Sequence, residues 1–198
     1  MRYVVVLFAL LFISCETSVP DKKGAFQPIW NELAFGERYT GYVKDALREH
    51  GDYLLEGEIR DLKKFCRFDD KNREDYFVFL ISVMAKFESN FDTYTAFEES
   101  FSDQEGNPVI SRGLLQISIE SSRNYKCNFN TEKDLHTAKL NLECGVRILN
   151  YWAKRDGHLH HRTWVGNYRG GARYWAVLRE GRPAYQKLSS YITSYCER

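Results

Sequence analysis

The strongest hydrophobic pattern in the chain is an almost continuous run at residues 76–85, YFVFLISVMA, in which nine of the ten residues are apolar. A helix that is apolar on all sides is a buried helix. A buried strand is the alternative, but the run continues to Glu88, which is helical length. Asp69 and Asp70 precede it, and acids favour the positive N-terminal end of a helix. We therefore predict a buried helix that begins after Asp70 and ends at Glu88.

The segments on either side of this helix also have helical spacing. Apolar residues recur at helical intervals in residues 28–66, with glycines as breaks, and again in residues 131–156, where TEKD is a plausible N-terminus. Residues 166–181, GNYRGGARYWAVLREG, predict a glycine-rich turn followed by another helix.

Only two short segments depart from this helical pattern. Residues 102–109, SDQEGNPV, predict a turn, and residues 112–118, RGLLQIS, predict either a strand or the entry to a helix. Strand patterns are few and no internal repeat is present. We therefore predict one mainly α-helical domain over residues 28–198, with at most a small β element.

The N-terminus has the pattern of an export signal. A basic residue, Arg2, is followed by eleven apolar residues and then by SCE, an arrangement typical of a secretory signal peptide and too short to span a bilayer. Because Cys15 lies where cleavage is expected, the segment resembles the lipobox of bacterial lipoproteins. We predict a signal peptide at residues 1–14, a lipidated Cys15 and a tether at residues 15–27, which place the protein on a membrane in the periplasm, with the outer membrane favoured. An ordinary secreted protein with an unpaired cysteine is the alternative.

Four further cysteines are consistent with export, because an even number in an oxidising compartment indicates disulfides. Three pairings are possible, and the sequence alone does not choose between them. We favour Cys127–Cys144, which closes the loop after the Leu-Leu-Gln block, and Cys66–Cys196, which ties the chain end to the entry of the buried helix. No Cys-x-x-Cys pair occurs, and the HLHH stretch at residues 158–161 lies in a polar turn without a matching carboxylate cluster nearby in sequence, so we predict no metal site.

The charge balance gives no indication of nucleic-acid binding. Without Arg2, the 28 Lys and Arg become 27, which equals the 27 Asp and Glu. Aromatic residues make up 15% of the chain, which suits a carbohydrate-binding protein and equally a well-filled core.

Glu88 is the best candidate for chemistry. A carboxyl group at the end of a buried helix is partly desolvated, and desolvation raises its pKa. A carboxyl that stays protonated near neutral pH can donate its proton to a glycosidic oxygen, which is the general-acid step of glycoside cleavage. Burial alone is a weak signal, because helix ends often carry acids.

Three sequence blocks in order strengthen this interpretation. ESNFD, NPVISRGLLQIS and NYRGGAR fall within residues 76–173, and together they resemble the soluble lytic transglycosylases and goose-type lysozymes of glycoside hydrolase family 23, the SLT-domain family. The family pattern is Glu-Ser at the end of a buried helix, then G-L-M-Q-I, then a G-x-x-R block. The resemblance implies a lysozyme-like α+β domain with a buried central catalytic helix.

The same resemblance implies roles for single residues. Glu88 would be the sole essential acid and base, and Gln116 would donate a hydrogen bond to the bound sugar. Four positions differ from the family pattern and are further substrate-binding candidates: Asn107, Ser118, Asn167 and Tyr168.

Six acids occur from Glu88 to Glu105, and the segment between Glu88 and Asn107 is longer than that of the family. They are Glu88, Asp92, Glu98, Glu99, Asp103 and Glu105. One of the last five is a candidate second catalytic carboxylate that holds a water, as in an inverting hydrolase. Alternatively, several line a groove and attract a cationic sugar such as deacetylated glucosamine. The third interpretation is a solvated acidic loop.

We therefore expect a monomeric enzyme that cleaves the β-1,4 bond between N-acetylmuramic acid and N-acetylglucosamine in peptidoglycan, as a lytic transglycosylase or a lysozyme, without metal or organic cofactor. The alternative is a non-catalytic glycan-binding lipoprotein of the cell envelope. From Arg147 to Lys187 the sequence has nine basic residues and only two acids. This excess suits a surface that binds the carboxylates of peptidoglycan stem peptides, or it consists simply of solvated helix faces.

Overall fold

The computed structural model describes residues 26–196, and the predicted signal peptide and Cys15 lie outside this range. The described part is mainly helical with one small antiparallel sheet, which confirms the predicted fold class. The α-helices are α1 (Gly36–His50), α2 (Asp52–Glu56), α3 (Arg73–Ser89), α4 (Ile119–Asn124), α5 (Ala138–Asp156) and α6 (Pro183–Cys196). The strands are β1 (Ala96–Ser102) and β2 (Pro108–Arg112). Short 3-10 helices are η1 (Ile29–Glu32), η2 (Asp70–Asn72), η3 (Glu132–His136), η4 (Gly170–Arg173) and η5 (Ala176–Leu178).

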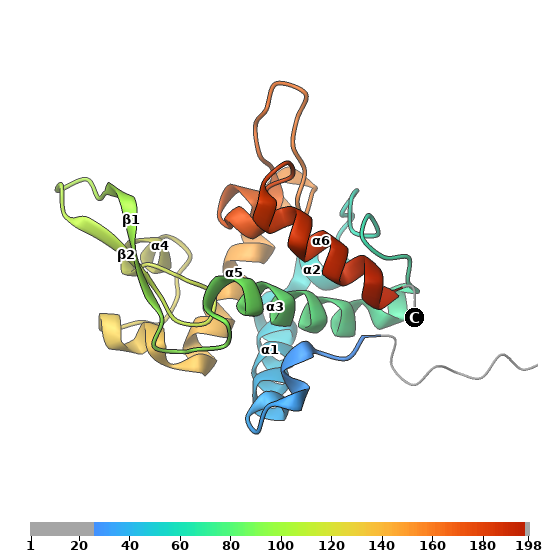
Figure 1. Ribbon diagram of the computed structural model, residues 1–198, viewed down its shortest axis with the longest axis horizontal. Helices are drawn as coiled ribbons and strands as arrows, with labels where there is room; N and C mark the ends of the chain where they lie inside the picture. Colours follow the sequence, from blue (N-terminus) through green and yellow to red (C-terminus); the bar gives the residue numbers. More distant parts are fainter. Residues whose placement is uncertain (1–25, 197–198) are drawn as a thin grey trace, which may run out of the picture.

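Helix α3 runs through the centre of the molecule (Figure 1). Every residue from 76 to 85 is buried, as the apolar run predicts. The 3-10 turn η2 leads into the helix, and Asn90 ends it in the left-handed conformation at φ 51°. Glu88 therefore lies in the last turn, next to the point where the chain leaves the core.

Helices α1, α2 and α6 pack around α3. Helix α6 packs against it, with the Tyr195 and Phe79 rings 4.4 Å apart, and α1 packs against both α3 and α5 (Figure 1). Both predicted disulfides are confirmed: Cys66 is bonded to Cys196 and Cys127 to Cys144, with Cα–Cα distances of 5.8 and 5.3 Å.

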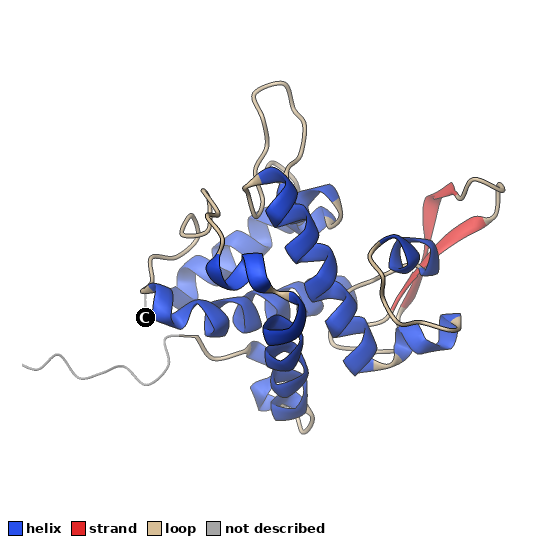
Figure 2. Ribbon diagram, turned by 180° about the vertical axis from the view of Figure 1, so that it is seen from behind, coloured by secondary structure: helices blue, strands red, loops and turns tan. Residues whose placement is uncertain are grey.

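The long acidic segment after α3 forms a hairpin. Strand β1 pairs antiparallel with β2, with Ala96 opposite Arg112 and Glu98 opposite Ile110. The predicted turn at residues 102–109 connects the strands, and the hairpin projects from one side of the helical body (Figure 2).

Three segments differ from those predicted. Phe26 is buried against Phe68, Tyr76 and Phe79, so this residue of the predicted 15–27 tether belongs to the packed domain. Thr131 caps η3 with a capping box, and α5 starts only at Ala138. Residues 170–178 form two short 3-10 turns rather than the predicted helix, and at Gly170 the backbone carbonyls of residues 158 and 159 leave no room for a side chain.

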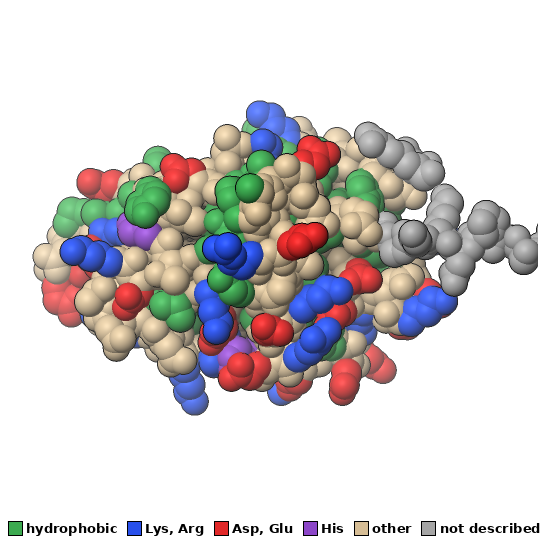
Figure 3. All heavy atoms as spheres, turned by 90° about the horizontal axis from the view of Figure 1, so that it is seen from below, with side chains coloured by type: hydrophobic (Ala, Val, Ile, Leu, Met, Phe, Trp, Pro, Cys, Tyr) green, Lys and Arg blue, Asp and Glu red, His purple; other side chains and the backbone are tan. Residues whose placement is uncertain are grey.

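The surface shows no concentration of one charge sign on the face in Figure 3, where acidic and basic side chains are interspersed. No helix within residues 26–196 is both long and apolar enough to cross a membrane.

Candidate active site

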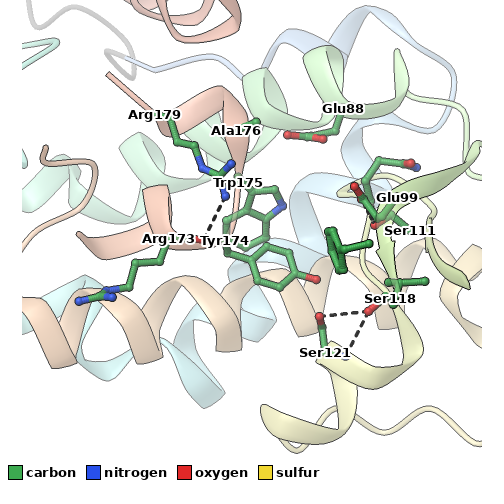
Figure 4. Close-up of a pocket in the computed structure, with 13 residues that line it drawn as sticks. Glu88, Glu99, Ser111, Ser118, Ser121, Arg173, Tyr174, Trp175, Ala176 and Arg179 are labelled. Carbon is green, nitrogen blue, oxygen red and sulfur yellow. Dashed lines mark hydrogen bonds between the residues drawn. The ribbon is translucent and has the colours of Figure 1, made fainter. Parts of the chain in front are cut away.

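A cavity of about 280 Å³ lies between the end of α3, the hairpin and the segment of η4 and η5 (Figure 4). Glu88 and Glu99 both line this cavity. The remaining lining residues are Phe101, Val109, Ser111, Gln116, Ser118, Ser121, Arg173, Tyr174, Trp175, Ala176 and Arg179.

Glu88 is held with its carboxyl group at the cavity and otherwise surrounded by protein. Within residues 26–196 it has no ion pair and accepts no hydrogen bond. Burial and, to a smaller extent, the nearby charge of Glu99 raise the pKa of Glu88 to about 7, while Arg179 opposes the rise. At neutral pH a substantial fraction of Glu88 is therefore protonated and able to donate.

Ser89 explains why the Glu-Ser pair is useful at this position. Its hydroxyl donates to the carbonyls of Ala85 and Leu114, at 3.1 and 3.0 Å, and so joins the helix end to the turn that follows β2. That turn begins at Gly113, whose φ is +77° and where a side chain would collide with the Leu135 carbonyl at 2.2 Å. Only glycine therefore fits at position 113, and the turn that it allows brings Gln116 to the cavity.

Two residues that sequence reasoning missed also hold this turn. The buried Asn141 side chain of α5 accepts from the Leu115 amide and donates to the Arg112 and Leu135 carbonyls. The Trp175 indole donates to the Leu115 carbonyl at 2.8 Å. In the sequence Asn141 is one polar position on an amphipathic helix, and nothing in its spacing distinguishes it.

Gln116 reaches the cavity, but its polar atoms are arranged differently from what the resemblance implies. Its side-chain nitrogen already donates to the carbonyls of Thr95 and Gly113. Its buried Oε1 has no hydrogen-bond partner within the described part of the chain. The free atom is therefore an acceptor, so Gln116 is suited to receive a hydrogen bond from a ligand rather than to donate one.

Glu99 is the one side chain of β1 that is partly buried, since the six others on the strand are exposed. The Ser111 hydroxyl donates to Glu99 Oε1 at 2.6 Å, which fixes the carboxylate from the neighbouring strand. Its position in the same cavity as Glu88 distinguishes it from the other candidate acids.

Those other acids are distributed around the hairpin. Asp103 and Glu105 line an adjoining hollow together with Glu120, whose Oε2 is buried and unpartnered among residues 26–196. Hydrogen bonds from the Asn107 side chain and backbone lower the pKa of Asp103 and stabilise the hairpin turn. Glu98 is exposed and lines neither space.

Asp92 also lies outside both spaces, where it accepts hydrogen bonds from the Tyr94 amide and the Thr95 hydroxyl. It therefore has a local structural role after the end of α3.

The substrate-binding candidates are only partly brought together. Ser118 lines the cavity and caps α4, whereas Asn107 lies at the hairpin turn. Asn167 and Tyr168 line a separate hollow with Arg169 and Arg173.

The tyrosine that reaches the cavity is Tyr174, which the sequence comparison did not single out. Its hydroxyl points toward Ser121 (Figure 4), and burial raises the pKa of Tyr174, so it remains neutral. Within residues 26–196 no group of three or more His, Cys, Asp or Glu side chains is arranged to hold a metal ion.

The comparison with solved structures supplies a relative. Wild-type DslA (Bd0314) superimposes with a TM-score of 0.80 and 42% sequence identity, and the match covers 87% of this chain and 98% of DslA. The chain belongs to the DslA family. Two further DslA structures, at 41% and 40% identity, are variants in which glutamates at positions 143 and 154 of DslA are each replaced by glutamine. No protein-family model matches the chain, and no curated protein does.

Proposed function

We propose that this protein cleaves the β-1,4 bond between N-acetylmuramic acid and N-acetylglucosamine in peptidoglycan. The observation that carries the proposal is Glu88: a carboxyl group at the end of a buried helix, with a pKa raised to about 7, at a cavity that a second carboxyl group, Glu99, also lines. This is the pair of groups that glycoside hydrolysis uses.

The DslA variants add support. The two glutamates replaced in DslA are eleven positions apart, and Glu88 and Glu99 have the same separation. The Glu-Ser and Gly-Leu-Leu-Gln blocks that resemble lytic transglycosylases and goose-type lysozymes are also the blocks joined by Ser89 at this cavity.

In the proposed reaction, Glu88 donates its proton to the glycosidic oxygen while the bond to the anomeric carbon of the muramic sugar breaks. An oxocarbenium-like centre develops on that carbon. In the hydrolase version, Glu99 takes a proton from a water that attacks this carbon, which leaves a reducing end. In the transglycosylase version, Glu88 takes the proton of the sugar's own C6 hydroxyl, which attacks and leaves a 1,6-anhydro end.

The position of Glu99 favours the hydrolase version, because the transglycosylase version requires no second carboxylate. Mass spectrometry of the products distinguishes reducing from anhydro ends. We expect that wild type cleaves the glycan and that both Glu88→Gln and Glu99→Gln lose this activity. Full activity of Glu99→Gln would assign the transglycosylase version, and full activity of Glu88→Gln would contradict the proposal as a whole.

The acidic side of the cavity further suggests a preference for deacetylated glycan. A deacetylated glucosamine carries an ammonium, which donates hydrogen bonds and pairs with carboxylates. Acceptors for it in and beside the cavity are Glu99, the free Oε1 of Gln116, and the adjoining Glu105 and Glu120. Exposed charge pairs contribute roughly 0.2–1 kcal/mol each. A Glu105→Gln/Glu120→Gln variant should lose part of the preference for deacetylated walls, whereas Glu98→Gln, on the outer face of β1, should keep it. Equal rates of wild type on both walls would remove this part of the proposal.

The N-terminal pattern supports a location. We propose that the protein is exported and anchored by a lipid on Cys15 in the periplasm, where peptidoglycan is found. Wild type should partition into the detergent phase, and Cys15→Ser should remain aqueous or uncleaved.

The alternative function is glycan binding without catalysis. Glu88 discriminates the two, because a binding protein has little need of a carboxyl group held at a pKa of about 7. A glycan-binding protein would keep its affinity for cell walls in Glu88→Gln and show no clearing activity in either form.

A further inference from the structure

The side of the cavity opposite the two glutamates is basic. Arg179 turns toward the cavity, whereas Arg173 points away from it (Figure 4). Arg173 also lines the neighbouring hollow formed with Asn167, Tyr168 and Arg169. The cavity and this hollow are therefore connected by arginines.

Arg179 is held rigidly but remains electrostatically unpaired. Its Nε donates to the Ala172 carbonyl at 3.0 Å, one Nη donates to the Arg173 carbonyl at 3.2 Å, and its guanidinium lies 5.5 Å from the centre of the Tyr168 ring. It has no carboxylate partner within 4 Å in the described part of the chain. Its second Nη, with two N–H groups, makes no hydrogen bond to another of residues 26–196.

The two arginines of the hollow share one carboxylate. Arg173 makes a bidentate pair with Asp156, at 2.6 and 3.2 Å, and Arg169 lies 3.7 Å from the same carboxylate. Asp156 is buried and also accepts from the Gly170 amide. Arg169 and Arg173 therefore share one carboxylate, and Arg179 has none within 4 Å, which leaves a positive site with fixed geometry.

We propose that Arg179, Arg169 and Arg173 form a carboxylate-binding subsite that takes the stem peptide of the glycan strand. A guanidinium binds carboxylates through paired N–H groups, and a positioned one gives both affinity and orientation. The inference rests on the proposed function: the stem peptide is attached to the muramic sugar, next to the bond that Glu88 would cleave. The hollow beside the cavity is where an attached peptide would lie.

The test uses three forms of one glycan preparation with the mature protein. The first form carries intact stem peptides. The second has its carboxylates coupled to methylamine. The third has been stripped by an amidase, which leaves the lactyl carboxylate of the muramic sugar as its only acid. Wild type should cleave the first at least about tenfold faster, in kcat/KM, than either of the others.

The variant Arg169→Gln/Arg179→Gln should reduce the ratio between the first and second forms to nearly one, and Arg169→Lys/Arg179→Lys should restore part of it. Arg173 is left in place, because its removal would leave buried Asp156 without its closest partner. Arg67→Gln, which removes an arginine that lines a different hollow, is the matched control and should keep the wild-type ratio.

Three results would overturn the inference. The first is a wild type that cleaves the first two forms at the same rate. The second is a rate ratio between these forms that survives in the Gln variant while all rates change together, which would make Arg179 a group that acts on Glu88 alone. Faster cleavage of the stripped form would assign the subsite to the lactyl carboxylate. A wild type inactive on all three forms would contradict the proposed function itself.

Discussion

Glu88, at the end of α3, and Glu99, on β1, line the same cavity. The negative charge of Glu99 raises the pKa of Glu88 in addition to the effect of burial, and a hydrogen bond from Ser111 holds Glu99 in place. A carboxyl group with a raised pKa next to a second carboxyl group is the arrangement that acid catalysis with a second carboxylate requires.

The first prediction concerns this coupling. In Glu99→Gln, the pKa of Glu88 should fall below about 7, because one of the two causes of its elevation is removed. NMR titration of the glutamate carboxyl carbons measures it without relying on activity. Glu98→Gln removes an exposed charge from the same strand and should leave the pKa of Glu88 unchanged. A Glu88 that titrates near 4.5 in the wild type would contradict the prediction.

The second prediction is the pH dependence of activity. A general acid must be protonated, so cleavage should decline as pH rises through about 7, by about tenfold per pH unit above it. Initial rates of wall clearing between pH 5 and 9 measure this. A rate that is constant up to pH 9 would remove Glu88 from the role of acid.

The third prediction is that the inactive Glu88→Gln variant is more stable than wild type at alkaline pH. The folded-state pKa of Glu88 lies above its ordinary value of 4.5, so wild type loses stability as pH rises from about 4.5 through about 7. Each pKa unit corresponds to about 1.4 kcal/mol, so a rise from 4.5 to about 7 makes the gain at pH 8 on the order of 3 kcal/mol. Thermal or urea unfolding at pH 8 and pH 4.5 tests this, and the gain should vanish at the lower pH.

The hydrophobic pattern identified the centre of the fold but not the hairpin. Helix α3 was predictable because its apolar run admits few structures other than a buried helix. Glu88 was predictable as the acid in the last turn of that helix. Strand β1 has no buried apolar face that a period of two could reveal, since its one partly buried side chain is the charged Glu99. The sequence therefore presented Glu99 as one of several acids, and only the pairing with β2 selects it.

Tyr174 and Asn141 could not be found for other reasons. Tyr174 reaches the cavity because residues 170–178 form 3-10 turns, whereas the motif comparison pointed to Tyr168. The role of Asn141 depends on contacts with the turn at Gly113, which is remote in sequence. Long-range contacts of this kind leave no local pattern.

The fourth prediction concerns the histidine stretch at residues 158–161. His160 is fully buried, its ring stacks on Phe65 at 4.1 Å, and neither ring nitrogen makes a hydrogen bond among the described residues, although Nδ1 lies 3.9 Å from the Asp61 carboxylate. Burial lowers the pKa of His160 to about 4, so the unfolded chain takes up a proton first as pH falls. Wild type should therefore lose stability between about pH 6.5 and pH 4.

His160→Phe should flatten this acid-dependent loss, by on the order of 2 kcal/mol, because it keeps the stacked ring and sacrifices no hydrogen bond within residues 26–196. Unfolding at pH 7 and pH 4.5 measures the difference, with His161→Phe as the control that should behave like wild type. An equal loss of stability in His160→Phe would show that another group causes the acid sensitivity.

The last prediction ranks the two disulfides. Cys66–Cys196 joins residues 130 apart and fastens α6 to the segment that precedes α3, whereas Cys127–Cys144 joins residues 17 apart. Restriction of the unfolded chain grows with the logarithm of loop length, which gives roughly 5 kcal/mol for the first bond and about 3 kcal/mol for the second. The Cys66→Ser/Cys196→Ser variant should therefore be the less stable of the two double variants in urea unfolding. Since α6 packs on α3, that variant should also lose wall-clearing activity at lower temperature than Cys127→Ser/Cys144→Ser. The reverse order of stability would mean that native packing around Cys127 and Cys144, rather than loop length, determines what each bond contributes.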